Sequence, residues 1–301
     1  MKNQETSTKS FGHAFLEPAI INCLFNGQGP EMKARRKALV PIINGVHLKH
    51  YTKVFNEHTH RAVDDLTKRI NMGEFDIYDE IESCIADMAF ETIFGIPGVA
   101  RDHGDLTIPH ASVVILETLY HRIITPWLHP SFIFNITEYG KAVGTATKTL
   151  HQYIRKLIRE KRELHVKLER GDSSVNKPEP SILDIWMEDI VITNEATDDE
   201  ILYEMIALFV GFHDTIIGVF SFIILTLAMH PDIQEKVRDE VISVIGSDAV
   251  VTEENVGKLK YIRMVILETM RLFPAGPLIL RSVTNDVKIG IKNILDEQGH
   301  C

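Results

Sequence analysis

The residue pair best suited to chemistry is Asp214-Thr215, within the segment Gly211–Thr215 (GFHDT). This segment interrupts the most apolar stretch of the chain, which runs from Ile206 to Met229. A carboxylate beside a hydroxyl is unexpected there, because unpaired polar groups are penalised in an apolar interior. Thr215 can bond back to the carbonyl four residues earlier and loosen the helix, and Asp214 can pass protons to a bound ligand. A polar spot satisfied by capping or by water explains the same residues equally well.

A second charged pair, Glu268 and Arg271, is spaced i and i+3 on a helix that ends before Pro274. This spacing places both side chains on one face of the helix. Glu235 and Arg238 show the same ExxR pattern, and we interpret them as an exposed ion pair that contributes little. Apolar residues flank Glu268 and Arg271 on both sides, so we expect this second pair to be buried.

Two basic clusters are weaker signals. Four histidines lie close together in the sequence, namely His47, His50, His58 and His60. On one helix the first three would share a face, as zinc ligands do. Carboxylates are sparse nearby, so a solvated face is the better interpretation. The run from Met32 to Lys37 could hold an anionic cofactor or an acidic partner. By itself it is better explained as a solvated charged turn.

The composition excludes several classes of protein. The 301 residues are 45% hydrophobic and 25% charged, with 32 Lys+Arg against 42 Asp+Glu and a net charge of −10. This is typical of a soluble globular protein, and the acidic balance argues against nucleic-acid binding. Cys23, Cys84 and Cys301 are too few and too far apart for a zinc site or a disulfide framework. Residues 1–10 contain no apolar run, so we expect no signal peptide and no leading membrane anchor.

Helices must position these residues, because helical periodicity runs through almost the whole chain. The apolar spacing predicts helices over Met32–Ile43, His47–Ile70, Phe75–Phe94, Val113–Tyr120, Ala142–Arg170 and Lys258–Phe273. A capping box at Thr197–Glu200 predicts a further long helix that ends near Met229. Pro231 begins the next helix and Gly246 stops it.

The segment Ile206–Met229 could be a buried helix or a membrane span. A polar interruption and a short uninterrupted remainder favour a helix that is buried on all sides. Strand character occurs only in Ile279–Ile291. The predicted fold class is therefore mostly α with a little β.

In this order the motifs resemble the middle of a cytochrome P450, a haem-thiolate monooxygenase, of the animal microsomal fatty-acid-hydroxylase-like branch. Gly211–Ile216 is similar to the family's oxygen-activation motif, in which an acid precedes an alcohol on a glycine-rich helix. Asp214 and Thr215 match that pair, whereas Phe212 and Ile216 replace a glycine and a threonine. The resemblance implies that Asp214 and Thr215 are catalytic and manage proton delivery.

The resemblance also implies haem as the cofactor. Arg36 matches the arginine that contacts one haem propionate, although Met32 stands where the family has a tryptophan. Arg281 matches the arginine that meets the other propionate. Glu268 and Arg271 match the ExxR pair that braces the fold. The implied architecture is one domain over residues 1–301, a cytochrome P450 helical core with an incomplete fold, matched at about 9–290 with a divergent tail at 291–301.

Parts of the family pattern are not matched in these 301 residues. The family's membrane anchor and first β-rich portion would precede residue 1, and the PERF segment and cysteine loop would follow residue 290. Cys301 has neither the glycines nor the arginine of that loop around it, so no residue is assigned as a metal ligand. The thiolate ligand pushes electron density to the iron so that the O–O bond breaks. We therefore expect a chain truncated at both ends, without monooxygenase turnover.

For the intact family, the resemblance implies oxygen insertion into an apolar small molecule at the endoplasmic reticulum membrane. Electrons would come from an NADPH-cytochrome reductase, for which Lys33–Lys37 is a candidate docking face. The chain as given, without an anchor, would be cytosolic and would bind no nucleic acid. One alternative is a non-catalytic truncated product, or a partial gene model, that binds at most a lipid or a partner. A helical zinc protein using His47, His50 and His58 is a further alternative.

Overall fold

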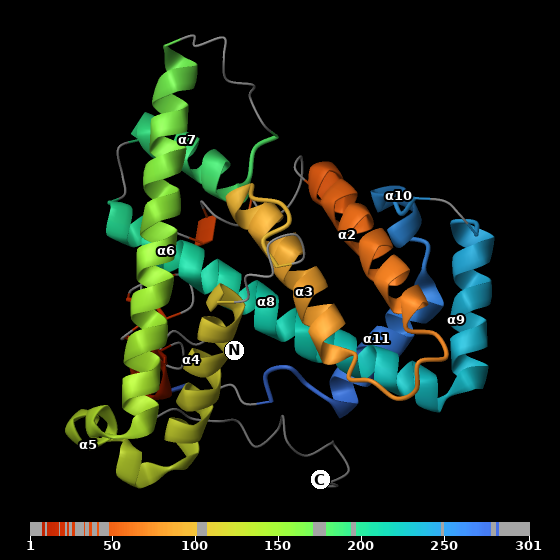
Figure 1. Ribbon diagram of the computed structural model, residues 1–301, viewed down its shortest axis with the longest axis horizontal. Coiled ribbons are helices and arrows are strands. Elements are labelled where there is room, and N and C mark those ends of the chain that lie inside the picture. Colours follow the sequence, from red (N-terminus) through yellow and green to blue (C-terminus); the bar gives the residue numbers. More distant parts are fainter. Residues whose placement is uncertain are drawn as a thin grey trace, which may run out of the picture.

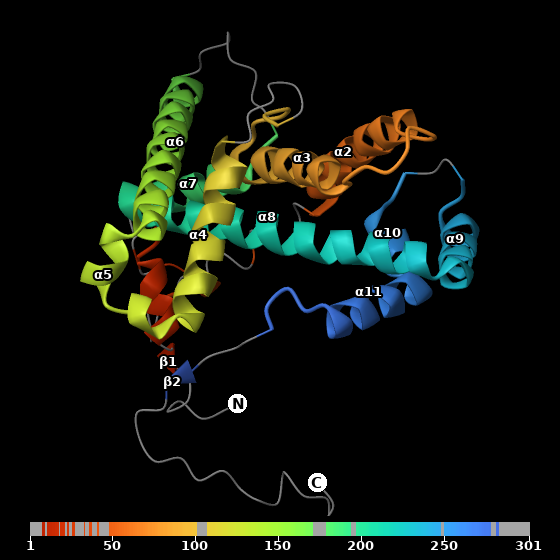
Figure 2. The ribbon, with the colours of Figure 1, turned by 60° about the horizontal axis from the view of Figure 1, so that its bottom comes forward.

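One long helix, α8 (Asp198–Met229), organises the fold in the computed structural model. It begins with the predicted capping box: the Thr197 hydroxyl accepts a hydrogen bond from the Glu200 amide at 3.3 Å, and the Glu200 carboxylate accepts one from the Thr197 amide at 2.8 Å. Figures 1 and 2 show α4 (Thr107–Ile124) and α6 (Glu138–Glu169) across its first half. They show α3 (Tyr78–Ala89) along its middle and α11 (Lys260–Leu272) along its last part.

The structure describes residues 8–9, 11–17, 19–21, 23, 26–27, 33, 36–37, 41, 48–100, 107–170, 179–193, 197–247, 250–277 and 281–282. The other helices are η2 (Phe11–Leu16), α2 (Leu48–Lys68), η3 (Phe90–Phe94), η4 (Pro126–Leu128), α5 (Ser131–Ile136), α7 (Ile182–Thr193), α9 (Pro231–Val244) and α10 (Glu253–Val256). The strands β1 (Thr8–Lys9) and β2 (Arg281–Ser282) pair antiparallel, with Lys9 opposite Arg281. The prediction of a mostly α fold with a little β is confirmed.

Most predicted helix boundaries agree with the structure. The helix predicted over Phe75–Phe94 is α3 followed by the π-helical turn η3, and it stops at Gly95, whose φ of 72° is left-handed. Helix α4 is longer than the predicted Val113–Tyr120, and α5 was not predicted. In Met32–Ile43 only four residues are described, and all four are helical. The strand predicted over Ile279–Ile291 is described only at residues 281–282, and its remainder lies outside the described residues.

The main core lies where α3, η3, α4, α6 and α7 meet the first half of α8. Three fully buried rings are at its centre: Phe209 on α8 lies 5.1 Å from Phe90 and 6.1 Å from Phe94 between ring centroids. These tilted contacts are the geometry that aromatic pairs prefer. The core therefore fixes the first half of α8, up to the turn that carries Asp214.

The expectation that Ile206–Met229 is buried on all sides is correct only for its first half. Ile206 and Phe209 are inaccessible, whereas Phe220 is 44% exposed and Met229 is 66% exposed. The reason is that, in the described part of the chain, the last turns of α8 lie beyond the main core and pack chiefly on α9 and α11. Among the described residues, α8 is the one helix long and apolar enough to cross a membrane, a property that core helices share.

Candidate functional site

Asp214 and Thr215 lie in the middle of α8 on neighbouring faces, because successive residues of a helix are about 100° apart. The Asp214 side chain is 15% exposed, whereas Thr215 is exposed. The Thr215 hydroxyl donates a hydrogen bond to the Gly211 carbonyl, which is the back-bond that the sequence predicts. The carboxylate therefore faces the protein and the hydroxyl lies on an open side of the helix.

The residue before this pair, His213, is fully buried. Its ring stacks on Phe209 with centroids 5.4 Å apart, and its Nδ1 lies 3.5 Å from the Asp214 Oδ1 atom. Among the described residues, neither ring nitrogen of His213 nor Oδ2 of Asp214 has a hydrogen-bond partner. Buried polar atoms without a hydrogen-bond partner are rare in folded proteins. A water, a ligand or a further segment at this turn of α8 would supply the missing hydrogen bonds. Sequence reasoning assigned His213 no role.

The surroundings of Asp214 are acidic. Burial, and then the negative charges of Glu82, Asp214 and Glu117, raise the pKa of Tyr78 above its usual value. Glu82 on α3 is itself buried, and its Oε2 atom lies 3.7 Å from Nε2 of the exposed His110 on α4. Carboxylates from three helices, α3, α4 and α8, therefore act on one phenol hydroxyl.

The side of α8 that carries the Thr215 hydroxyl is open. Gly211 and Gly218 lie on the same side, since they are four residues before and three residues after Thr215. A Cβ atom added at either glycine would meet nothing within 4 Å. A flat group could therefore approach the backbone of α8 here and reach one hydroxyl.

Glu268 and Arg271 form the predicted pair in a two-pronged geometry, with Nε to Oε2 at 2.8 Å and Nη2 to Oε1 at 2.7 Å. The expectation that the pair is buried is wrong in the described part of the chain: the side chains are 58% and 67% exposed. The reason is that α11 packs mainly on α8 and α9 there. Thr269 faces α8, with its hydroxyl oxygen 3.2 Å from that of Thr226, and no described element covers the opposite face.

The two arginines matched to haem propionates are described only in part. Arg36 is helical and exposed. Arg281 contributes its backbone to β2, and the contacts of its side chain lie outside the described features. Their cofactor-binding roles stay predictions.

The histidine cluster forms no metal site in the described residues, where no group of three or more possible ligands gathers. His58 is buried, with Nε2 at 2.7 Å from Oε2 of Glu91, so the expectation of a solvated face is wrong for this residue. His60 is exposed, and His47 lies outside the described residues. Glu91 is 33 residues away from His58 in the sequence, and no local sequence pattern predicts that the two side chains meet.

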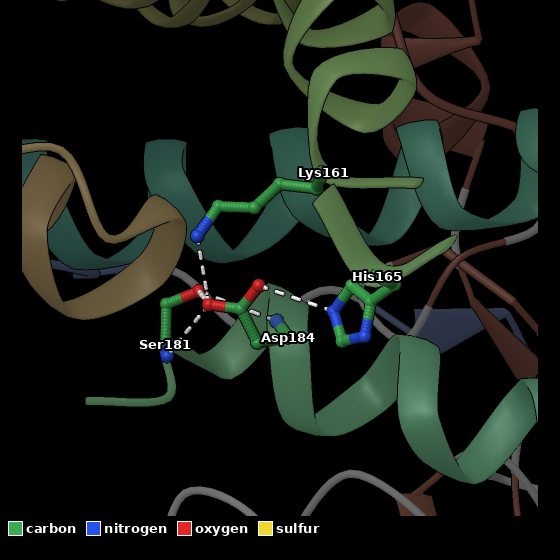
Figure 3. Close-up of polar contacts among 4 residues, drawn as sticks. All are labelled: Lys161, His165, Ser181 and Asp184. Carbon is green, nitrogen blue, oxygen red and sulfur yellow. Dashed lines mark hydrogen bonds and ion pairs between the residues drawn. The ribbon is translucent and has the colours of Figure 1, made fainter. Parts of the chain in front are cut away.

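Figure 3 shows a buried polar cluster of Lys161, His165, Ser181 and Asp184, which sequence reasoning missed. Asp184 accepts hydrogen bonds from Lys161 Nζ at 2.8 Å and from the Ser181 hydroxyl at 2.6 Å. Burial alone would raise the pKa of Asp184, but these hydrogen bonds outweigh it and lower that pKa. The serine hydroxyl donates to the aspartate rather than to His165, so no nucleophile is activated. The cluster joins α6 to the start of α7.

Comparisons with known proteins identify the family. The sequence model described as "Cytochrome P450" matches residues 3–294. Curated relatives include Cytochrome P450 4c21 of Blattella germanica, 27% identical over 296 residues that make up 96% of this chain and 59% of that protein. Cytochrome P450 4V2 of Homo sapiens is 28% identical over 296 residues, 95% of this chain and 56% of that protein. The chain belongs to the cytochrome P450 family, and it spans less than two thirds of the length of these relatives.

Proposed function

We propose that this chain is the helical portion of a haem-dependent monooxygenase that inserts oxygen into an apolar small molecule. The observation that carries the proposal is the acid–alcohol pair of α8, with the Thr215 hydroxyl on the open side of the helix and the Asp214 carboxylate beside it facing the protein, in a chain matched to the family over residues 3–294. The side formed by Gly211, Thr215 and Gly218 suits a flat cofactor such as haem, because no side chain blocks its approach.

In this proposal, bound haem supplies the oxygen-activating chemistry, and the chain manages protons and position. Thr215 can turn its hydroxyl from the Gly211 carbonyl towards the open side and donate a hydrogen bond there. Asp214 can relay the replacement proton through Oδ2, which has no hydrogen-bond partner among the described residues. The fixed first half of α8 keeps both groups in place.

Charged residues have supporting roles in the same proposal. Arg36 and Arg281 bind the two propionates, since guanidinium groups pair well with carboxylates. Glu268 and Arg271 brace α11. The exposed Lys33 contributes to a docking face for an NADPH-cytochrome reductase. The full-length protein would then work at the endoplasmic reticulum membrane.

The test uses the haem-loaded, full-length protein with Thr215→Ala and Asp214→Asn. We expect product formed per NADPH consumed to fall about tenfold or more in each variant, because proton delivery is impaired. Thr215→Ser keeps the hydroxyl and should form nearly as much product per NADPH consumed as the wild type. An unchanged ratio of product to NADPH in both Thr215→Ala and Asp214→Asn would exclude a role for these two residues in proton delivery.

The second candidate is a non-catalytic product that binds at most a lipid or a partner. The observation behind it is that Cys23 and Cys84, the cysteines among the described residues, are both buried. Under this candidate, the purified 301-residue chain gives no carbon monoxide difference band at the thiolate position. Such a band, or a transcript that continues beyond Cys301 into a cysteine loop, would favour the enzyme.

A further inference from the structure

Among the described residues, His213 is the one side chain with two buried polar atoms that lack a hydrogen-bond partner. The residue has no exposed surface at all. Burying a polar group without a partner costs free energy, and an apolar ring of similar shape would fill the same space without that cost. The imidazole therefore indicates a function beyond packing.

The core fixes the position of the His213 ring. Phe209 lies one turn earlier on α8, the long helix of Figure 2, and the two rings are nearly parallel, with an angle of 10° between them and centroids 5.4 Å apart. Phe209 is itself fully buried and packs on Phe90 and Phe94. A ring held in a close-packed core can turn only a little, so its two nitrogens point in set directions.

The Asp214 carboxylate, in contrast, has few contacts that hold it. Its Oδ2 atom has no hydrogen-bond partner among the described residues, and its Oδ1 atom lies 3.5 Å from Nδ1 of His213. Glu82 on α3 and Glu117 on α4, two helices that pass α8 (Figure 1), bring further negative charge to the same region. Within the described part of the chain, His213 is therefore the group best placed to orient this carboxylate.

The contact between Nδ1 and Oδ1 determines which nitrogen carries the proton of the neutral ring. With the proton on Nε2, two lone pairs would face each other across 3.5 Å, and the buried N–H group would have no acceptor. With the proton on Nδ1, the ring donates to Oδ1, and closing the gap by about 0.3 Å gives an ordinary hydrogen bond. Only Nε2 then lacks a partner, and buried acceptors without a partner are more common than buried N–H groups without one. The proton on Nδ1 is therefore favoured.

We propose that His213 is a positioning residue for Asp214, which it holds by a hydrogen bond from Nδ1 to Oδ1. This bond makes the two carboxylate oxygens unequal, because Oδ1 is occupied and Oδ2 stays free to relay a proton. The rigid ring also keeps the carboxylate in one rotamer beside Thr215. The positioning role rests on the proposed function, in which Asp214 delivers protons, whereas the hydrogen bond itself does not.

The position of the proton can be measured in the 301-residue chain without any cofactor. Proton–nitrogen correlation spectra of histidine rings distinguish a proton on Nδ1 from one on Nε2, and the His213 signals are those that disappear in His213→Phe. We expect the proton on Nδ1. In Asp214→Ala it should move to Nε2, because the acceptor beside Nδ1 is gone. A proton on Nε2 in the wild-type chain, or no change in Asp214→Ala, would overturn the proposal.

In the haem-loaded, full-length protein, the same hydrogen bond should affect the product formed per NADPH consumed. His213→Phe keeps an aromatic ring against Phe209 but has no donor, so the ratio should fall by about fivefold or more. His213→Asn places an amide N–H group near the position of Nδ1, and its ratio should stay within about twofold of the wild type.

The matched control is Ile217→Val, because Ile217 is 1% exposed on the same helix and its side chain has no polar atom. This variant changes the packing around α8 and should leave the ratio of product to NADPH unchanged. Circular dichroism checks that all variants keep their helix content.

An unchanged ratio in His213→Phe would overturn the positioning role. An equal fall in His213→Phe and His213→Asn would also overturn it, because it would indicate an effect of packing alone. An unchanged ratio in Asp214→Asn would exclude proton delivery, and with it the positioning role, while the proton could still lie on Nδ1 of His213. A proton on Nε2 would exclude the role of His213 and leave the proposed function intact.

Discussion

Two ion pairs in this protein have nearly the same contact distance and opposite surroundings. Lys161 Nζ lies 2.8 Å from Asp184, and Arg271 Nη2 lies 2.7 Å from Glu268. The first two side chains are 12% and 8% exposed, and the second two are 67% and 58% exposed. The contact distance alone therefore does not indicate how much an ion pair contributes to stability, because that contribution depends on how strongly water screens the two charges.

The pairs also differ in how many elements they join. The Lys161–Asp184 pair links α6 to α7 and lies against the end of η3, where a Cβ atom at Gly95 would be 2.8 Å from Lys161 Nζ. The Glu268–Arg271 pair stays within one turn of α11. Only the first pair can hold separate parts of the described chain together.

The largest expected effect is that of Asp184→Asn. This substitution leaves Lys161 buried without a counter-charge, so the free energy of unfolding should fall by about 3 kcal/mol. Urea denaturation measures it. The control is Asp199→Asn, which breaks an exposed pair with Arg155 and should cost less than about 0.5 kcal/mol. If the free energy of unfolding fell equally in the two variants, the buried and the exposed ion pair would contribute equally to stability.

Gly95→Ala should have the next largest effect and lower the free energy of unfolding by about 2 kcal/mol. The left-handed φ of 72° strains any side chain, and the added Cβ atom would push Lys161 away from Asp184. Gly73→Ala is the matched control, because Gly73 has a φ of 91° and nothing within 4 Å of a Cβ atom. It should cost about 1 kcal/mol from backbone strain alone. A cost at residue 95 no larger than at residue 73 would mean that the contact with Lys161 has no effect.

The pH dependence of stability should show a smaller effect of the same cluster. The folded-state pKa of Asp184 lies below its unfolded value, so the unfolded chain binds more protons and stability falls as the pH is lowered through these values. Urea unfolding between about pH 6 and pH 3 should show a shallower slope for Asp184→Asn than for the wild type. If the free energy of unfolding changed with pH equally in Asp184→Asn and the wild type, the pKa of Asp184 would be the same in the folded and unfolded states.

The smallest effect is expected for Glu268→Gln. The hydrogen bond from Arg271 lowers the pKa of Glu268, but water surrounds both side chains. The melting temperature of the 301-residue chain should change by less than about 1 °C, as measured by circular dichroism. A longer protein in which another segment covers α11 should lose much more stability on this substitution. A large loss in the 301-residue chain itself would mean that the pair is buried in solution.

Local signals predicted local structure well. The capping box at Thr197, the proline at residue 231 and the left-handed glycines at residues 95 and 246 each act within one turn, so the sequence alone locates those helix ends. The back-bond of Thr215 to Gly211 is equally local and was also predictable. Of the candidate site, the sequence thus predicted the helix that carries Asp214 and Thr215 and the hydrogen bond of Thr215, while the catalytic role of the two residues stays a prediction.

Features that depend on packing were not predictable in the same way. Lys161 and Asp184 are 23 residues apart, and nothing in either segment signals that they meet. The burial of Glu268 was inferred from apolar neighbours, but burial requires a covering element, and none of the described elements covers it. The missing partners of His213 likewise depend on what surrounds α8 rather than on the residue itself.

Helix α8 is about 48 Å long, since its 32 residues rise by about 1.5 Å each. Amide hydrogens near Leu202 can exchange with solvent only when the core opens, because Leu202 is inaccessible. Those near Leu225, which is 49% exposed, can exchange whenever α11 separates from α8. Hydrogen exchange should therefore quicken along one continuous helix. We therefore expect α8 to span two cooperative unfolding units, with the acid–alcohol pair near the boundary between them.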